Sequence, residues 1–234
     1  MNASTDCTIV VAGKEHLGFA EQICEEMAAS ARARGTGIAR RSPEYISEKM
    51  LEGKAVIAFA PDGAWAGFCY IETWGHGKYV ANSGLIVAPP YRKSGLAKAI
   101  KKKIFGLSRS KFPEAKIFGL TTGLAVMKIN SELGYEPVTY SELTDDDEFW
   151  KGCRSCVNFG ILVSKERKNC LCTAMLYDPA DKEKGEPAKG LWDFARKSKL
   201  YERFMKIKQI ALLRGSKSGE EKEKKKSLIS FFNF

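Results

Sequence analysis

The sequence predicts an α/β protein built on a mixed sheet with helices on both faces. Two β-rich runs, residues 55–60 and 64–74, are joined by Pro61-Asp62-Gly63, a turn sequence that makes them an antiparallel hairpin. A strand, a helix and a strand follow at residues 79–87, 96–111 and 115–122. This β-α-β order requires one parallel pair, so the sheet must be mixed.

The elements before the hairpin follow from apolar spacing and from helix-capping residues. Residues 7–12 are a short apolar run, as in a strand. Residues 15–33 place apolar side chains such as Ile23 and Met27 at helical spacing between acidic residues, which predicts a helix. Ser42-Pro43-Glu44 is typical of a helix start, and this second helix should end near residue 53.

The elements after the hairpin are predicted in the same way. The helix over residues 96–111 carries Leu96, Ile100, Ile104 and Leu107 on one face. A helix over residues 125–133 ends at Gly134, a typical C-cap residue. The remaining β-like runs predict strands at residues 137–143, 156–163 and 170–177.

A change of composition after residue 178 predicts two parts. Residues 1–178 form the folded domain, with a Cys-rich hairpin at 150–178, and residues 179–234 add a charged linker, a basic amphipathic helix and a low-complexity tail. This extension holds 15 of the 38 Lys and Arg but 8 of the 28 acidic residues, so most of the net charge of +10 belongs to it. Its helix is expected to pack on the domain, while docking to a partner or to an anionic membrane surface stays open.

Composition also disfavours several protein classes. No stretch approaches the length of a membrane-spanning helix, and the N-terminus lacks the apolar segment of a signal peptide. Seven cysteines without an export signal indicate reduced thiols in the cytoplasm. A nucleic-acid enzyme concentrates positive charge on its working domain, so no nucleic-acid partner is expected here, although the tail alone could bind DNA or RNA.

The segment Arg92-Lys-Ser-Gly-Leu-Ala97, between a strand and a helix, has the properties of an anion site. The first turn of a helix leaves backbone N–H groups free, and the helix dipole favours negative charge there. Gly95 and Ala97 let a diphosphate approach the backbone, Ser94 can donate a hydrogen bond, and Arg92 and Lys93 are cationic. A Walker loop and a dinucleotide fingerprint do not match, which leaves a solvated glycine turn as the alternative.

An Arg-x-x-Gly-x-Gly/Ala loop in this position resembles the coenzyme A loop of the GNAT superfamily, and the element order over residues 7–163 resembles its fold. The resemblance implies an N-acyltransferase that uses acetyl-CoA or another acyl-CoA and acylates a primary amine of a small molecule. It implies that the backbone of Ile86 and Val87 pairs with the pantetheine arm. It also implies that the loop holds the pyrophosphate through residues Arg92, Lys93, Ser94, Gly95, Leu96 and Ala97.

One residue departs from the family pattern. Many GNAT enzymes have a Tyr that protonates the departing thiolate, whereas this chain has Asn130 at that cofactor-contacting position. An amide can orient a ligand but cannot act as an acid, so Tyr135 or Tyr140 would have to supply the proton, or none is needed. The departure keeps a second function open, a non-catalytic CoA-binding or zinc-stabilised interaction module.

The acceptor amine must lose a proton before it can attack, so a general base is expected. Glu72 and His76, at and just after the end of the 64–74 strand, are the candidates, and a surface Glu and a loop His are the alternatives. Tyr135 is retained as the candidate acid.

Three arginines form a candidate substrate site. Arg34, Arg40 and Arg41 flank a glycine-containing loop, and guanidinium groups suit carboxylates, although a solvated basic loop is the alternative. Residues 34–42 and 72–76 resemble a bacterial GNAT subgroup associated with arginine biosynthesis. That resemblance implies amino-acid metabolism, with the α-amine of glutamate or a related amino acid as the acceptor. The oligomeric state, a homodimer included, stays open.

Four cysteines are grouped in two pairs, Cys153 with Cys156 and Cys170 with Cys172, and 13 residues separate the pairs. Two such knuckles on a β-hairpin can arrange four thiolates around a structural zinc ion. Buried small side chains, a redox pair and chance strand alternation are the alternatives.

Overall fold

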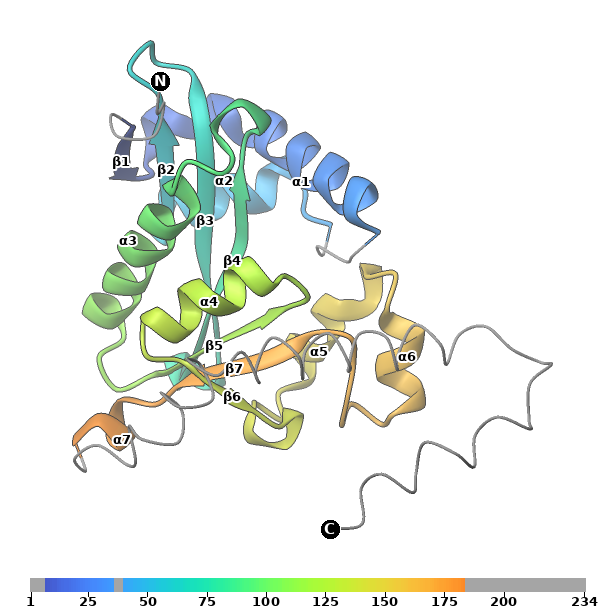
Figure 1. The fold of residues 1–234 in the computed structure, drawn as a ribbon. Helices are drawn as coiled ribbons and strands as arrows, with labels where there is room; N and C mark the ends of the chain where they lie inside the picture. The colour runs from blue at the N-terminus through green and yellow to red at the C-terminus, as the bar shows by residue number, and fades with distance from the viewer. Residues whose placement is uncertain (1–6, 36–39, 184–234) are drawn as a thin grey trace, which may run out of the picture. The chain divides into compact units, whose positions relative to one another are not determined.

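The computed structural model describes residues 7–35 and 40–183 and shows the predicted mixed sheet (Figure 1). Seven strands lie in the order β1-β2-β3-β4-β5-β7-β6. The β4–β5 pair is parallel and the other neighbouring pairs are antiparallel. The strands are β1 Thr8–Val11, β2 Ala55–Phe59, β3 Trp65–Trp74, β4 Tyr79–Val87, β5 Lys116–Thr121, β6 Glu136–Val138 and β7 Thr173–Tyr177.

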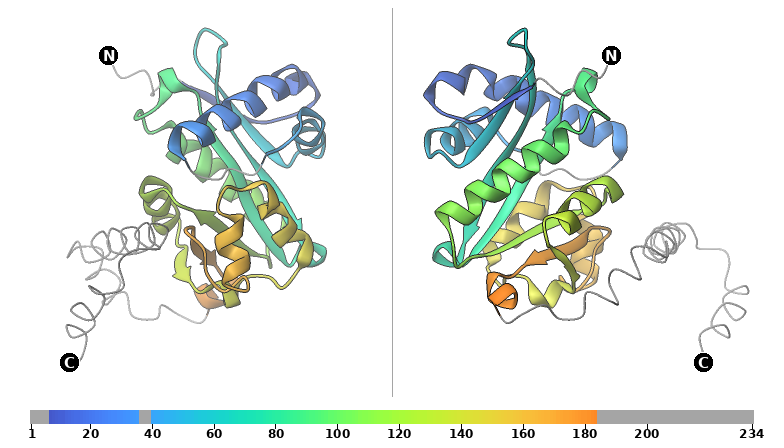
Figure 2. Two further views of the ribbon diagram at one scale, coloured as in Figure 1. Left: turned by 90° about the vertical axis from the view of Figure 1, so that its right-hand side faces the viewer. Right: turned by 60° about the vertical axis from the view of Figure 1, so that its left-hand side comes forward.

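Helices cover both faces of the sheet, as expected (Figure 2). Helices α1 (Ala20–Arg34) and α2 (Pro43–Leu51) lie on one face, and α3 (Leu96–Lys111) and α4 (Leu124–Glu132) lie on the other. The predicted cap of α2 is confirmed, because the Ser42 side chain accepts the Tyr45 N–H and Pro43 opens the helix. Three short helices follow: α5 Asp147–Lys151, α6 Phe159–Ser164 and α7 Pro179–Glu183.

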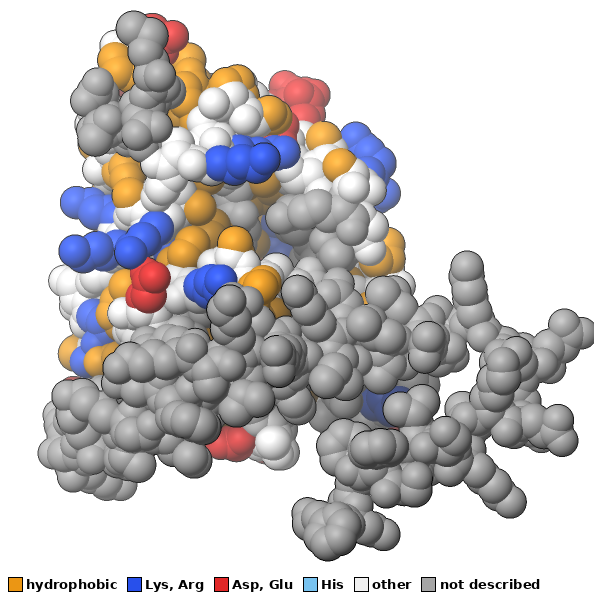
Figure 3. Space-filling view, in the orientation of Figure 1, with side chains coloured by type: hydrophobic (Ala, Val, Ile, Leu, Met, Phe, Trp, Pro, Cys, Tyr) orange, Lys and Arg blue, Asp and Glu red, His pale blue; other side chains and the backbone are white. Residues whose placement is uncertain are grey.

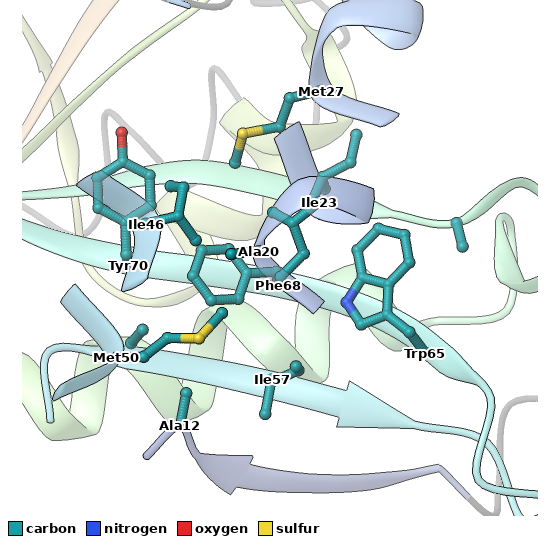
Figure 4. Packing of buried hydrophobic residues seen from close by; sticks show 13 residues of the cluster. Ala12, Ala20, Ile23, Met27, Ile46, Met50, Ile57, Trp65, Phe68 and Tyr70 are labelled. Atoms are coloured by element: carbon teal, nitrogen blue, oxygen red, sulfur yellow. The ribbon is translucent and has the colours of Figure 1, made fainter. Parts of the chain in front are cut away.

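The core under α1 and α2 fixes which side chains of β3 face these helices (Figure 4). Phe68 and Tyr70 of β3 pack against residues of both helices, including Ile23 and Ile46. Burying each of these side chains stabilises the fold by roughly 1.5–3 kcal/mol. Because side chains alternate along a strand, the same register turns Glu72 toward this face.

A β-bulge in β4 was not predicted. Two β4 residues, Gly84 and Leu85, stand opposite Cys69 of β3. Gly84 has a φ of 64°, and a Cβ atom there would lie 2.3 Å from Cε1 of Tyr70, so only glycine fits. The extra residue shifts the alternation of β4, and Ser83 and Ile86 therefore both face the α1/α2 side.

Several element predictions after residue 136 are wrong. The predicted strand at 156–163 is largely helix α6, because only Phe159 and Leu162 reach the core while Val157 and Val163 are 75% and 56% exposed. The predicted strand at 137–143 ends at Val138 and continues as a 3₁₀ turn. Tertiary packing overrides the β-propensity of these short apolar runs.

The predicted extension is largely outside the described residues. Its first residues form α7 rather than a linker, and the predicted amphipathic helix and tail at 191–234 lie beyond the described part. The division at residue 178 therefore stays a prediction. Within residues 7–35 and 40–183, no helix has the length and hydropathy needed to cross a membrane.

Candidate active site

The turn between β4 and α3 presents backbone N–H groups to solvent. Lys93 and Gly95 are both left-handed, with φ values of 61° and 89°, and Ser94 Oγ donates to the Tyr91 carbonyl. The Leu96 N–H reaches Ser94 Oγ at 3.5 Å. Within the described residues, no acceptor receives the N–H groups of Lys93, Ser94, Gly95 and Ala97. Consecutive residues whose backbones differ in handedness turn their N–H groups toward one concavity. At the start of a helix, such a concavity binds anions.

Arg92 supports this turn from the α1 side. Its Nη2 donates to Glu26 Oε1 at 2.6 Å and to Ser30 Oγ at 2.9 Å, and its Nε donates to the Val87 carbonyl at 3.1 Å. Arg92 therefore orders the turn, whereas Lys93 is exposed beside it. Further Lys and Arg side chains project along the α3 side of the molecule (Figure 3).

The strands β4 and β5 separate shortly after they meet. They pair only over residues 79–81 and 116–118, after which β4 continues beside β3 and β5 continues beside β7. From Asn82 onward, the edge of β4 that faces β5 has no strand partner in the described part of the chain. We call residues 82–87 the open edge of β4; it contains Ile86 and Val87 and leads directly into the turn at Arg92.

On the α1/α2 face, a polar cluster surrounds Glu72, which is 8% exposed. Glu72 Oε1 accepts hydrogen bonds from Arg41 Nη2 at 2.9 Å and from the Tyr45 hydroxyl at 2.7 Å. Glu72 Oε2 accepts a hydrogen bond from Ser83 Oγ at 2.5 Å, and Arg41 Nε donates to the Tyr70 hydroxyl at 2.9 Å. We call these five residues the Glu72 cluster.

The charges of this cluster reinforce one another. Burial works to lower the pKa of Arg41, but Tyr70 and Glu72 raise it overall, so the guanidinium stays charged. Burial and the neighbouring Glu72 carboxylate raise the pKa of Tyr45, so its hydroxyl stays a donor. The arrangement holds an anionic carboxylate in a fixed orientation at the side of the open edge.

The three predicted arginines have different environments. Arg41 turns inward to Glu72, whereas Arg40 is exposed and its backbone N–H donates to Ser155 Oγ at 3.1 Å. The side chain of Arg34 and residues 36–39 lie outside the described part. The Ser155 contact brings the 3₁₀ helix Gly152–Ser155 beside Arg40. A Cβ atom on Gly152 would lie 3.8 Å from Arg41 Nη2, so this helix is also next to the Glu72 cluster.

The other two predicted catalytic residues do not join Glu72. His76 is exposed in the β3–β4 turn with a φ of 55°. Tyr135 is buried on the α3/α4 face, where its hydroxyl donates to Asn82 Oδ1 at 3.1 Å. The sequence analysis also missed Tyr45 and Ser83, because only the folded chain brings them to the Glu72 carboxylate.

A second polar cluster surrounds Asn82, the first residue of the open edge. Asn82 Nδ2 donates to Ser108 Oγ at 2.7 Å, and Lys101 Nζ donates to the Asn82 carbonyl at 3.4 Å. Lys101 is 2% exposed, and burial lowers its pKa to about 8. Lys101 Nζ also lies 5.4 Å from the centre of the Tyr135 ring. We call these four residues the Asn82 cluster.

Asn130 lies on the same face, beside the start of the gap between β4 and β5. A Cβ atom on Gly119, the first β5 residue beyond the pairing with β4, would lie 3.3 Å from Asn130 Nδ2. Asn130 is 1% exposed, and its Oδ1 has no hydrogen-bond partner among the described residues. An acceptor therefore remains available at this predicted cofactor-contacting position.

The structure does not support the predicted zinc site. Cys153, Cys156, Cys170 and Cys172 are free thiols, and no group of His, Cys, Asp or Glu in the described ranges is placed to hold a metal ion. The predicted hairpin is absent, because the first pair lies on a 3₁₀ helix and the turn after it. Cys156 Sγ accepts a hydrogen bond from the Asn158 N–H, and Cys170 Sγ donates one to the Asn158 carbonyl. These two thiols therefore contact the backbone of Asn158.

This chain shares its fold with solved acetyltransferases of the GNAT superfamily. It superposes on a GNAT superfamily phosphinothricin acetyltransferase from Sinorhizobium meliloti in complex with AcCoA, with a TM-score of 0.52 and 16% identity over 80% of this chain and 95% of the other. The protein Rv2747 from Mycobacterium tuberculosis, in complex with CoA, gives a TM-score of 0.53 and 16% identity over 73% of this chain and 98% of the other.

N-acetylglutamate synthase from Neisseria gonorrhoeae, complexed with coenzyme A and N-acetyl-glutamate, is also similar. Its TM-score is 0.52 at 15% identity, over 74% of this chain, which spans only 35% of the synthase chain. No protein-family model and no curated protein sequence matches the chain. The predicted resemblance is thus confirmed at the level of the fold.

Proposed function

We propose that this protein is an acyl-CoA-dependent N-acyltransferase that transfers an acetyl or succinyl group to a primary amine of a small molecule. The observation that carries the proposal is the open edge of β4, which leads into a turn where four N–H groups have no acceptor among residues 7–35 and 40–183. The amides of a pantetheine arm can pair with the open edge as an added strand would. The diphosphate of the same ligand can then bind at the start of α3.

The Glu72 cluster suits the proton transfer that this reaction needs. A carboxylate offers about four lone-pair positions, and Arg41, Tyr45 and Ser83 use three of them. The remaining position on Oε2 can accept a proton from an attacking amine, directly or through water. Glu72 is therefore the proposed base, and Arg41 and Tyr45 hold its carboxylate in place. Exposed His76 has no part in this mechanism.

The proposed acceptor is the α-amine of glutamate or a related amino acid. Arg40 is exposed beside the 3₁₀ helix Gly152–Ser155, and a guanidinium group there can bind a carboxylate. Sharing its fold with an N-acetylglutamate synthase supports this choice. The proposal places the enzyme in the cytoplasm and in amino-acid metabolism, with residues 1–178 as the catalytic domain and 179–234 as an extension.

Two measurements on the full chain test the proposal. Calorimetry measures CoA binding, and a thiol-release assay with acetyl-CoA and succinyl-CoA measures turnover on an amino-acid panel that includes glutamate. Gly95→Glu places a negative charge at the turn and a side chain at a left-handed position with a φ of 89°, and together these changes should weaken CoA binding by about 100-fold or more. Gly106→Glu makes the same change at an open position further along α3 and should leave binding unchanged.

The outcomes separate the two functions that the sequence left open. A protein that binds no CoA species contradicts both of them. Tight CoA binding without thiol release on any amine favours the non-catalytic CoA-binding module, for which Asn130 at the usual acid position is the motivating observation. Equal effects of Gly95→Glu and Gly106→Glu would show that CoA binds elsewhere.

A further inference from the structure

Lys101 is a deeply buried cation without an acidic partner. Among the described residues it forms no ion pair, whereas the other deeply buried charge, Glu72, is paired with Arg41. The described groups that face Lys101 are the Cys69 thiol of β3, the Asn82 carbonyl of β4 and the Tyr135 ring, which contacts the Tyr177 ring. No carboxylate is among them. Lys101 has no role in the proposed binding of CoA or in the proton transfer to Glu72.

Lys101 lies where β4 and β5 part. Asn82 stands opposite Ile71 of β3, and the Ile71 N–H donates to the Lys54 carbonyl on the other side of β3. In an antiparallel pair, this pattern turns the N–H and carbonyl of Asn82 away from β3 and toward β5. The Asn82 carbonyl is therefore the first group of the open edge, and Lys101 Nζ donates to it in place of a β5 amide.

Acyl transfer from a thioester generates a thiolate anion. If the pantetheine arm pairs with the open edge, its sulfur end approaches the point where the strands part, which is the position of Lys101. We propose, building on the proposed function, that Lys101 donates a proton to the CoA thiolate as it leaves. Asn130, at the usual donor position, has no acidic proton.

The proton balance of the step is simple. The amine nitrogen forms a bond to the thioester carbon, the carbon–sulfur bond breaks, and its electron pair stays on sulfur. Lys101 Nζ gives one proton to that sulfur, which yields the CoA thiol and a neutral amine on Lys101. Glu72 takes the proton that the attacking nitrogen loses, and both side chains then exchange protons with solvent.

The neighbouring acids are poorer donors. Burial lowers the pKa of Lys101 to about 8, near the value of about 8.5 for an ordinary thiol, which favours proton transfer between them. Burial raises the pKa of Cys69 to about 11 and that of Tyr135 well above its usual range. The Cys69 thiol and the Tyr135 hydroxyl therefore stay protonated while Lys101 exchanges its proton near neutral pH.

A titration of bound CoA tests the proposal without any knowledge of the acceptor. The ultraviolet absorbance of the thiolate reports the pKa of the CoA thiol in complex with the full chain, with an S-methylated CoA complex as the blank. A cation near the sulfur lowers this pKa, so Lys101→Met should raise it by about 1–3 units relative to the unmodified protein. Lys102→Met, at the exposed neighbouring position, is the matched control and should leave it unchanged. Equal thiol pKa values with and without Lys101 overturn the proposal.

Single-turnover rates provide the second measurement. The rate of the unmodified protein should fall as the pH rises through about 8, because Lys101 must be protonated to act. Lys101→Gln keeps an N–H for the Asn82 carbonyl but has no acidic proton, so it should lose this pH limb and slow the reaction by about 10²–10⁴-fold. A Lys101→Gln protein that keeps the original rate and pH profile overturns the proposal. Failure of the unmodified protein to bind CoA would instead remove the proposed function itself.

Discussion

The two polar clusters lie on opposite faces of the same strand, and they differ in how their charge is balanced. Ser83 of β4 joins the Glu72 cluster, and its neighbour Asn82 joins the cluster that contains Lys101. Glu72 has an arginine and two hydroxyl donors. Lys101 has a carbonyl, a thiol and an aromatic ring as neighbours, and no carboxylate from the described residues. Because side chains alternate along β4, the balanced Glu72 cluster and the unbalanced Lys101 lie on opposite sides of the open edge.

This difference in charge balance suits each face of the sheet to a different step of the proposed reaction. A balanced ion pair holds a carboxylate in one orientation, which suits repeated proton transfer from an acceptor. A buried cation without a carboxylate partner destabilises the folded protein, and a bound anion next to it would offset that destabilisation. In the proposed reaction, the sheet thus separates the side where the amine loses its proton from the side where the thiolate forms.

Breaking the balanced cluster should have the largest effect. Glu72→Gln leaves Arg41 without its partner, and the free energy of unfolding should fall by about 3–5 kcal/mol. Loss of the proposed base should lower kcat by about 10²–10⁴-fold. Urea unfolding and initial rates measure the two effects. The control is Glu132→Gln, which removes an exposed ion pair with Lys98 and should cost less than about 1 kcal/mol. Equal losses of stability in the two variants would contradict the difference in burial on which the comparison depends.

The α3 side of the site was predictable because its signals are local. Helix α3 was predicted with its observed bounds, and the preceding turn follows from residues adjacent in sequence. The spacing of Lys101 with Ile104 and Ser108 also marks Lys101 as inward-facing, although the sequence analysis placed Leu107 on the apolar face instead. A lysine that occurs at the helical spacing of buried residues is therefore a sequence signal for a buried cation.

The Glu72 side was less predictable because its contacts are distant in sequence. Arg41 and Tyr45 reach Glu72 across 31 and 27 residues, and no local pattern pairs them. The bulge at Gly84 depends on the Tyr70 ring beneath it. The segment at 156–163 has strand-like composition, but packing on Trp150 and its neighbours selects a helix in which Leu162 faces inward.

Removing the unbalanced charge should have the next largest effect, with the opposite sign. The pKa of Lys101 is lower in the folded chain than its ordinary value, so between pH 8 and 10.5 the unfolded chain binds more protons. The free energy of unfolding therefore receives a contribution from Lys101 that rises with pH across this window. Lys101→Met should remove that contribution and stabilise the protein at pH 7 by up to about 3 kcal/mol.

The measurement is urea unfolding at several pH values, compared between Lys101→Met and Lys102→Met. Other groups titrate in both variants, so the difference between the two isolates Lys101. A Lys101→Met protein that is less stable than Lys102→Met at pH 7 would show that the charge is already compensated, and the contrast between the two faces would no longer hold.

The smallest effects come from removing one hydroxyl on each face. Tyr45→Phe deletes a donor to the ionised Glu72 carboxylate, and hydrogen bonds to charged groups contribute about 1.5–3 kcal/mol. Tyr135→Phe deletes a donor to the neutral Asn82 amide, for which about 0.5–1.5 kcal/mol is expected, while its ring still faces Lys101. Urea midpoints at equal m-values give both numbers. Tyr45 is only half-buried whereas Tyr135 is 2% exposed, so a larger loss in Tyr45→Phe would reflect the charge of its acceptor and not its burial. A loss in Tyr135→Phe as large as that in Tyr45→Phe would show that burial, and not the ion pair, sets the strength of these clusters.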